Sequence, residues 1–210
     1  MTGIQTLLVI AKRPVPGRVK TRLIGACTPA QAADLAAAAL ADTLRALQDF
    51  PSKDRVILLD GDPAGLVPDG WDVLPQVGGG LDRRLAAGFA AVPDGPALLV
   101  GMDTPQLSAE LLDFDPYAYD SCLGPATDGG YWAIGLAEPH RAADVIEGVP
   151  MSTGATGAEQ HRRLVAAGMS VQRLAALTDV DTEDSAAEVA AAAPGTGFAR
   201  CWRQLRDGAR

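Results

Sequence analysis

Residues 5–47 read QTLLVIAKRPVPGRVKTRLIGACTPAQAADLAAAALADTLRAL, and the order of patterns within them predicts the architecture of the chain. Residues 5–10 are a short apolar run of the kind found in strands that are buried on both faces of a sheet. A loop rich in proline and glycine follows to about Gly25. Residues 28–31 (TPAQ) supply an N-cap, a proline at the first helical position and a glutamine three residues after the cap, which together predict a helix to about Leu47. The stretch is therefore a strand–loop–helix unit.

The same alternation of apolar runs and helical patterns continues along the chain. Strands that alternate with helices predict an α/β fold, with a mainly parallel sheet covered by helices. A second capping box, Thr156–Glu159, is expected to open one of the helices. No repeat or linker divides residues 1–210, so we expect a single domain. The further strands are predicted at residues 55–59, 71–74, 97–100, 121–123, 131–136 and 170–174, and the further helices at residues 81–92, 156–167, 183–193 and 198–205.

The composition disfavours several classes of protein. Hydrophobic residues make up 48% of the 210 residues and charged residues 21%, so there is no compositional case for disorder. The net charge of −8 disfavours nucleic-acid binding, because that binding depends on neutralising many backbone phosphates. No apolar run approaches the roughly 20 residues of a membrane helix, so we expect a cytoplasmic protein without a membrane partner. The three cysteines lack C-x-x-C spacing, which argues against a disulfide framework or a zinc site.

Basic residues gather in the loop after the first predicted strand. Residues 12–22 hold five of the 18 basic residues, and all five precede the first acidic residue, Asp34. In open α/β sheets, ligands bind beyond the carboxyl ends of the strands, where this loop lies. The loop is neither a Walker A nor a dinucleotide-binding motif, but its cations suit the oxygens of a polyphosphate; a solvated basic loop is the alternative. The predicted phosphate-binding residues are Lys12, Arg18, Lys20 and Arg22.

Carboxylates follow two of the predicted strands. Asp103 stands just past the buried run at residues 97–100, where a hard oxygen ligand can hold Mg²⁺ or Mn²⁺ against phosphate oxygens. Aspartate is also a common N-cap and turn residue, so a structural role for Asp103 is equally open. Residues 179–184 (DVDTED) follow the last predicted strand, and there Asp181 is either a second metal ligand or a helix cap.

Two glycine-rich segments are candidates for the walls of a small-molecule pocket. Residues 124–132 read GPATDGGYW, in which Asp-Gly is a hairpin signal and the aromatic pair beside a carboxylate suits a pocket. Residues 76–80 (QVGGG) offer an amide and flexible backbone to the edge of a base, or form a simple turn.

Together these segments resemble a bacterial family of GT-A-like transferases, commonly labelled glycosyltransferase-like, and more distantly the molybdenum-cofactor and 2-phospholactate nucleotidyltransferases. The motifs that carry the resemblance lie at residues 11–23, 101–105, 124–131 and 179–184. The resemblance implies a Rossmann-like GT-A fold of the nucleotide-diphospho-sugar transferase type, a mainly parallel mixed sheet with helices on both faces. It also implies that Asp103 and Asp181 hold the metal and that the basic loop contacts phosphate.

The resemblance further implies where the nucleotide and the acceptor bind. Residues 76–85 are similar to the family segment Gln-x-Gly-x-Asp-Leu-Gly-x-Arg-Met, except that Gly80 replaces the aspartate and Asp82 replaces the second glycine. Met151 stands where a tryptophan is usual before Ser-Thr. The implied nucleotide contacts are Gln76, Gly78, Gly79 and Arg84, and the implied acceptor contacts are Asp128, Gly129, Gly130, Tyr131 and Thr153.

We therefore predict a metal-dependent transferase that acts on a nucleotide and a small acceptor, with Lys20 and Asp103 as catalytic residues. The first hypothesis is nucleotidyl transfer from a nucleoside triphosphate to a small phosphorylated or acidic acceptor, with release of pyrophosphate. The basic loop favours it, because a triphosphate carries more charge than the diphosphate of a sugar nucleotide. The alternatives are glycosyl transfer from a nucleotide-sugar and a non-catalytic nucleotide-binding module.

Overall fold

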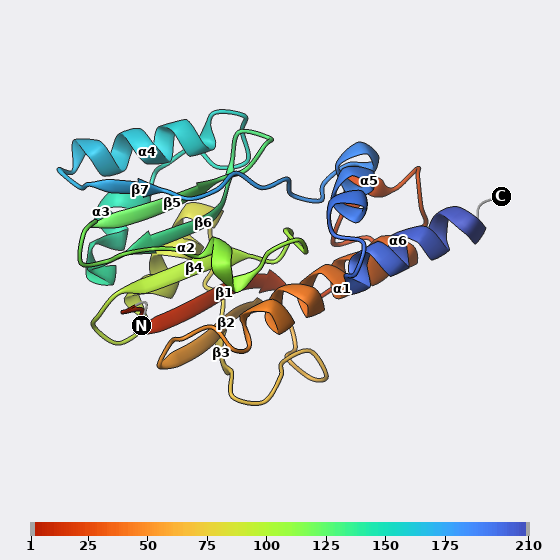
Figure 1. Cartoon of the computed structure of the whole chain (residues 1–210), viewed down its shortest axis with the longest axis horizontal. Helices are drawn as coiled ribbons and strands as arrows, with labels where there is room; N and C mark the ends of the chain where they lie inside the picture. Colours follow the sequence, from red (N-terminus) through yellow and green to blue (C-terminus); the bar gives the residue numbers. More distant parts are fainter. Residues whose placement is uncertain (1–2, 209–210) are drawn as a thin grey trace.

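The computed structural model describes residues 3–208, in which a seven-stranded sheet is covered by helices on both faces (Figure 1). The strands are β1 (Thr6–Lys12), β2 (Asp54–Asp60), β3 (Asp72–Pro75), β4 (Ala97–Gly101), β5 (Ser121–Pro125), β6 (Tyr131–Leu136) and β7 (Val171–Arg173). Their order is β3-β2-β1-β4-β6-β5-β7. Of these strands β6 alone runs antiparallel to its neighbours, β4 and β5. The predicted mainly parallel mixed sheet is therefore confirmed.

Helices pack on both faces of the sheet and on one another. The α-helices are α1 (Pro29–Leu47), α2 (Leu81–Ala90), α3 (Ala142–Ile146), α4 (Thr156–Ala166), α5 (Glu183–Ala192) and α6 (Gly197–Gly208), and the 3₁₀ helices are η1 (Thr21–Leu23), η2 (Ala109–Leu111) and η3 (Pro139–Arg141). Helix α1 covers one face, and α2, α3 and α4 cover the other (Figure 1). Helices α5 and α6 pack against α1 in a third core. None of the helices between residues 3 and 208 is both long and apolar enough to span a membrane.

The alternation of side chains along the central strands builds a core on each face of the sheet. In β1, Leu7 and Val9 belong to the core under α1, whereas Leu8 and Ile10 belong to the core under α2. Strands β2 and β4 alternate in the same way, because their parallel register with β1 aligns equivalent positions. Both faces are apolar, which is why these segments are continuous hydrophobic runs in the sequence.

Most predicted elements are present, with shifted ends. The capping box at the start of α1 is confirmed: the Thr28 hydroxyl accepts the Gln31 backbone N–H at 3.3 Å, and the Gln31 side chain accepts the Thr28 N–H at 2.8 Å. The capping box predicted at Thr156 is wrong. Thr156 is the first residue of α4 instead of its cap, and its buried hydroxyl donates to the Pro150 carbonyl at 2.9 Å. Helix α3 lies outside the predicted ranges.

A buried carboxylate joins the first helix to the last. Asp42 on α1 is 4% exposed, and its oxygens accept the backbone N–H groups of Gly197 and Phe198 at 3.0 and 2.7 Å. Arg45 forms an ion pair with the same carboxylate. The first N–H groups of a helix lack partners within it and carry partial positive charge, so a carboxylate caps them well. Asp42 therefore fixes the start of α6 on α1.

We predict that Asp42→Ala lowers the free energy of unfolding by about 2 kcal/mol, because it removes hydrogen bonds to a charged group and leaves buried N–H groups unpaired. Urea denaturation followed by circular dichroism measures the change. Asp34→Ala is the control, since Asp34 is exposed on the same helix and its loss should cost less than about 0.5 kcal/mol. Equal unfolding midpoints for the two variants would contradict this role of Asp42.

Candidate functional site

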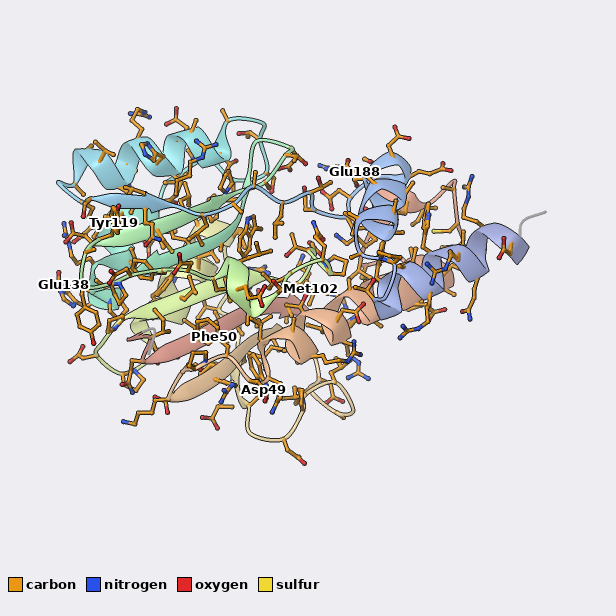
Figure 2. The ribbon with its side chains drawn as sticks, viewed as in Figure 1. Asp49, Phe50, Met102, Tyr119, Glu138 and Glu188 are labelled. Atoms are coloured by element: carbon orange, nitrogen blue, oxygen red, sulfur yellow. The ribbon has the colours of Figure 1, made fainter. Side chains whose placement is uncertain are left out.

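The carboxyl ends of the parallel strands open into a cleft of about 730 Å³. Its walls come from the loop after β1, the segment between β3 and α2 with the start of that helix, the segment after β4, the turn between β5 and β6, and the segments before α4 and α5. Met102, labelled in Figure 2, lies just past β4 and lines the cleft, with its Sδ atom 3.2 Å from the backbone nitrogen of Lys12. Segments far apart in the sequence meet at the edge of the sheet where α/β proteins bind ligands.

The cleft brings together most of the residues that the sequence singles out. Gly78 and Gly129 are the exceptions, since each lies next to a lining residue without lining the cleft itself. The predicted site residues that do line it are Lys12, Arg18, Lys20, Arg22, Gln76, Gly79, Arg84, Asp103, Asp128, Gly130, Tyr131, Thr153 and Asp181. Their roles in binding and catalysis stay predictions.

Lys20 contacts both predicted metal ligands. Its Nζ atom is 2.8 Å from Asp103 Oδ1 and 3.1 Å from Asp181 Oδ1, and its side chain is 6% exposed. Arg22, whose side chain is largely exposed, contacts the other oxygen of Asp181 at 3.0 Å. Burial by itself lowers the pKa of the Lys20 ammonium, but the two carboxylates outweigh it and hold that pKa above its usual value. Lys20 is therefore a charged link between the segments after β4 and before α5.

The two other predicted phosphate-binding residues are free of ion pairs. No carboxylate within residues 3–208 forms a salt bridge with Lys12 or Arg18, and both side chains line the cleft. Their charges are available to an anion that binds there. The loop thus combines two unpaired cations with two that are already paired to carboxylates.

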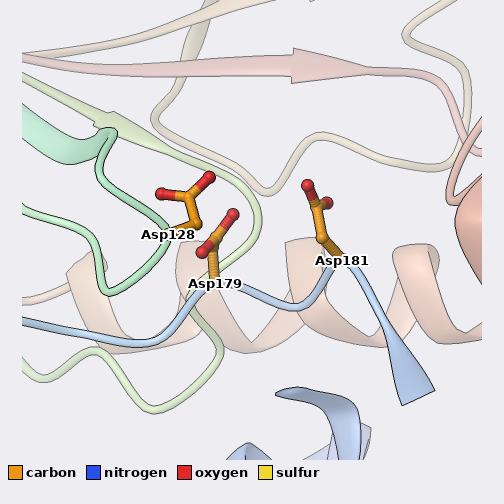
Figure 3. A group of neighbouring side chains, drawn as sticks. All are labelled: Asp128, Asp179 and Asp181. Carbon is orange, nitrogen blue, oxygen red and sulfur yellow. The ribbon is translucent and has the colours of Figure 1, made fainter. Parts of the chain in front are cut away.

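Three carboxylates gather in the cleft, and one of them, Asp181, is a partner of Lys20 (Figure 3). Asp128, Asp179 and Asp181 each offer an oxygen, and these oxygens lie within 4.8 Å of one another. Burial, followed by repulsion from Asp128 and Asp181, raises the pKa of Asp179 to about 6. Asp103 stands outside this group, although its backbone carbonyl accepts the Val180 N–H at 2.9 Å. The cluster suits a divalent cation, and Asp181 is the residue that it shares with the predicted metal pair.

Gln76 is tied to the protein backbone. Its Nε2 atom donates to the carbonyls of Ala11 at 2.7 Å and Leu58 at 2.9 Å, so both amide hydrogens are engaged. Its Oε1 atom accepts from Arg84 Nη1 at 3.2 Å, and Arg84 Nε donates to the Gly79 carbonyl at 3.0 Å. Gln76 therefore holds Arg84 in the cleft through its amide oxygen. Its two amide hydrogens cannot also contact a base, because both are bonded to backbone carbonyls.

The two departures from the family pattern are physically linked. A Cβ atom at Gly80 would lie 2.4 Å from Asp82 Oδ1, so the Asp82 side chain occupies the space that a side chain at position 80 needs. Asp82 Oδ2 accepts the Gly148 N–H at 2.8 Å, and this bond lowers the pKa of the Asp82 carboxyl. Asp82 thereby anchors the start of the segment that leads to Met151 and Thr153.

The predicted acceptor wall is built from two loops in close contact. Gly129 has φ 92°, and a Cβ atom there would lie 2.1 Å from the Gly154 carbonyl oxygen, so only glycine allows this approach. The Gly129 carbonyl accepts the Gly157 N–H at 2.8 Å. Burial raises the pKa of Tyr131, whose hydroxyl donates to Gln160 Oε1 at 3.3 Å. The two loops thus form one continuous wall of the cleft.

Two residues of the cleft were missed in the sequence. Asp179 stands beside Asp181 in the DVDTED segment, and the acidic run was the available signal. Thr104 follows Asp103, lines the cleft, and has a buried hydroxyl with no hydrogen-bond partner among residues 3–208. Nothing in the sequence around Thr104 distinguishes it from a turn residue.

The raised pKa of Asp179 gives a pH dependence of defined sign. Because this pKa is about 6 in the folded protein and near 3.8 otherwise, the free energy of unfolding falls as pH rises between those values. We predict that Asp179→Asn is more stable than the wild type at pH 7.5 by about 1 kcal/mol, after allowance for solvent screening, with little difference near pH 3.5. Calorimetric melting in metal-free buffer measures this.

Asp184→Asn is the control for Asp179→Asn, because it removes the same charge from an exposed position of the same segment. This variant should show no gain in stability at pH 7.5. A gain of the same size in both variants, or no gain for Asp179→Asn, would mean that Asp179 is not strained by its neighbours.

Solved structures share this fold. A protein from Desulfovibrio desulfuricans G20, provisionally named a nucleotide-diphospho-sugar transferase, is 28% identical, with a TM-score of 0.83 over 97% of this chain and 94% of that chain. Rv0371c from Mycobacterium tuberculosis H37Rv, in complex with manganese, is 19% identical, with a TM-score of 0.54 over 88% and 97%. CMP:2-keto-3-deoxy-manno-octonic acid synthetase, in complex with CTP, is 12% identical, with a TM-score of 0.58 over 88% and 96%. The fold is that of the nucleotide-diphospho-sugar transferases.

No curated protein matches the chain, whereas one protein family does. The family described as "Uncharacterized protein conserved in bacteria (DUF2064)" matches residues 43–153, which is more than half of the 210 residues. The matched segment holds Gln76, Asp103 and Asp128, whereas the basic loop and Asp181 lie outside it. The chain therefore belongs to the bacterial DUF2064 family.

Proposed function

We propose that this protein is a metal-dependent nucleotidyltransferase, which moves a nucleotidyl group from a nucleoside triphosphate to an acceptor oxygen and releases pyrophosphate. The proposal rests on one observation: the basic loop and several carboxylates line the same cleft. The two sets of charges are in contact, because Lys20 forms ion pairs with Asp103 and Asp181. Phosphoryl-type transfer needs positioned cations for phosphate oxygens and carboxylates for a metal ion. Both lie at the same edge of the sheet.

The carboxylates fit a hard divalent cation such as Mg²⁺ or Mn²⁺, which takes oxygen ligands. Asp103 and Asp181 are the proposed ligands, with Asp128 and Asp179 beside them. Burial and then repulsion from Asp128 and Asp181 raise the pKa of Asp179, and a bound cation relieves such repulsion. When bound, the metal would neutralise phosphate charge and polarise the α-phosphate. The manganese complex of the Mycobacterium tuberculosis neighbour supports such a cation.

The chain's own cations would hold and stabilise the phosphates. Lys12 and Arg18 would bind the phosphate chain, since both line the cleft and neither forms an ion pair with a carboxylate of residues 3–208. In this reaction an acceptor oxyanion would form a bond to the α-phosphorus of the triphosphate. The bond between the α-phosphorus and the oxygen that bridges it to the β-phosphorus would break, and the electron pair of that bond would leave with pyrophosphate. Lys20, Arg18 and Arg22 would stabilise the charge that develops on the pyrophosphate. An oxyanion acceptor carries no proton to remove, so positioning and electrostatics do most of the work.

The two ends of the cleft would divide the substrates between them. Arg84 would face the nucleotide, with Gln76 acting through it because the Gln76 amide is already bonded to the backbone. Tyr131 and Thr153 would border the acceptor, together with Asp128, on the wall that the two close loops form.

Glycosyl transfer from a nucleotide-sugar is the second candidate. The name of the Desulfovibrio desulfuricans protein, which is 28% identical over almost the whole chain, favours it. The leaving group would then be a nucleoside diphosphate, and Asp128 could take the proton of an acceptor hydroxyl. The same cleft serves both reactions, so the leaving group distinguishes them.

We predict that a nucleoside triphosphate is the tightest Mg²⁺- or Mn²⁺-dependent ligand, because the cations of the basic loop match its charge better than that of a sugar diphosphate. Calorimetric titration with the common triphosphates and sugar nucleotides measures the affinities, and chromatography of the products separates pyrophosphate from nucleoside diphosphate. If a sugar nucleotide binds best and no triphosphate competes with it, glycosyl transfer takes the place of this proposal.

We also predict that Arg18→Ala weakens triphosphate binding about 10- to 100-fold and leaves nucleoside binding unchanged, since a charge-assisted hydrogen bond of roughly 1.5–3 kcal/mol acts on phosphate alone. Arg13→Ala is the matched control from the same loop, because the Arg13 guanidinium donates to the carbonyls of Asp62 and Ala64. Equal losses for nucleoside and triphosphate would show that the loop is a structural element.

A further inference from the structure

The ammonium of Lys20 lies between the two carboxylates that are the proposed metal ligands. Its Nζ atom is 2.8 Å from Asp103 and 3.1 Å from Asp181, which are charge-assisted hydrogen-bond distances. A metal ion that both carboxylates bind has to lie between them as well. The two cations would therefore compete for one position, and their mutual repulsion keeps them from sharing it.

The two proposed metal ligands are paired with cations of the chain itself, although Asp128 and Asp179 bring further negative charge close to Asp181. Lys20 and Arg22 supply two positive charges against the negative charges of Asp103 and Asp181. The Lys20 side chain is 6% exposed, so water screens its charge poorly. A free divalent cation can bind the two carboxylates only if Lys20 releases them. The Lys20 ammonium would then be a buried charge without a partner, which is unfavourable.

A polyphosphate changes this balance. It brings several anionic oxygens to the edge of the sheet, where Lys12 and Arg18 have no salt-bridge partner in the part of the chain that the structure describes. Lys20 can then exchange Asp103 and Asp181 for phosphate oxygens and remain paired. The exchange frees both carboxylates for the cation that the polyphosphate carries, so each ligand favours the binding of the other.

The exchange requires only a side-chain movement. The Lys20 backbone adopts the left-handed conformation, with φ 48° and ψ 39°, and caps the 3₁₀ helix η1. Its carbonyl accepts the Leu23 N–H at 2.9 Å, and Leu23 is fully buried in the core that α1 forms with α5 and α6. The backbone is anchored, so the exchange would be a rotation of the long lysine side chain about its own bonds.

We propose that Lys20 holds the metal position until a polyphosphate arrives, so that the divalent cation binds as the chelate of a nucleoside polyphosphate and not as a free ion. This inference rests on the proposed function, and it names the metal–polyphosphate chelate as the substrate class. A purely structural ion pair, which only fastens the loop, predicts no coupling between metal and polyphosphate through Lys20.

The test is Mn²⁺ binding to the full chain, measured by electron paramagnetic resonance of the free ion, with and without inorganic tripolyphosphate. Protein-free samples correct for chelation by tripolyphosphate itself. We expect the wild type to bind Mn²⁺ at least 10-fold more tightly when tripolyphosphate is present. Lys20→Met should bind Mn²⁺ alone at least 10-fold more tightly than the wild type and gain little from tripolyphosphate.

Arg18→Met is the matched control, because it removes the same charge from the same cleft at a residue that has no salt bridge to a carboxylate between residues 3 and 208. It should weaken tripolyphosphate binding and leave the binding of Mn²⁺ alone unchanged. Asp103→Asn in the Lys20→Met background should return Mn²⁺ affinity to the wild-type level. Lys20→Gln serves in place of Lys20→Met if the methionine variant does not fold.

Unchanged or weaker binding of Mn²⁺ alone in Lys20→Met would overturn the inference. An equal gain in Mn²⁺ affinity in Arg18→Met would also overturn it, as would a gain in Lys20→Met that remains after Asp103→Asn is added. These outcomes are separate from the failure of nucleotidyl transfer. Suppose that the Mn²⁺ binding results are as expected but the enzyme releases a nucleoside diphosphate in place of pyrophosphate. Nucleotidyl transfer is then wrong, but the binding of metal as a chelate stands, because a sugar nucleotide also carries a diphosphate.

Discussion

The ion pairs of Lys20 are the interaction on which the rest of the cleft depends. They join the loop after β1 to a segment that lies 161 residues further along the chain. Without this ammonium, the carboxylates of Asp103 and Asp181 would face the further charges of Asp128 and Asp179 with no buried cation among them. The cations and carboxylates of the cleft thus stabilise each other, which explains how so many like charges fit at one edge of a sheet.

The C-terminal helices position this charged centre, although they lie away from the sheet. Asp181 immediately precedes Thr182, whose hydroxyl caps α5 by accepting the Ser185 N–H at 3.2 Å. Helix α5 packs with α6 and α1, and Asp42 fixes the start of α6. Leu23, at the end of the basic loop, is buried in the same core. Both sides of the Lys20–Asp181 contact are therefore anchored in one helical cluster.

Patterns that depend on neighbours in the sequence were predictable, and patterns that depend on neighbours in space were not. The apolar runs gave the buried strands, TPAQ gave the start of α1, and strand ends gave the location of the cleft. The Asp-Gly signal likewise indicated the hairpin of β5 and β6. The pairing of β6 with β4, the use of the Gln76 amide by two backbone carbonyls and the inclusion of Asp179 in the acidic cluster depend on contacts between segments far apart in the sequence. Thr156 satisfies the capping-box pattern, yet the helix begins one residue earlier than the pattern predicts: the Glu159 N–H donates to the Ala155 carbonyl at 2.9 Å, and the Thr156 hydroxyl donates to the Pro150 carbonyl in the loop before α4.

The contact between positions 80 and 82 restricts how this protein can diverge from its relatives. A side chain at Gly80 collides with the carboxylate of Asp82, and Asp82 in turn holds the backbone of Gly148. An aspartate at both positions would force the Asp82 carboxylate to move, and with it the hydrogen bond to the Gly148 N–H, whereas glycine at both would leave the loop before α4 without this anchor. The effect of a substitution at position 80 therefore depends on the residue at position 82.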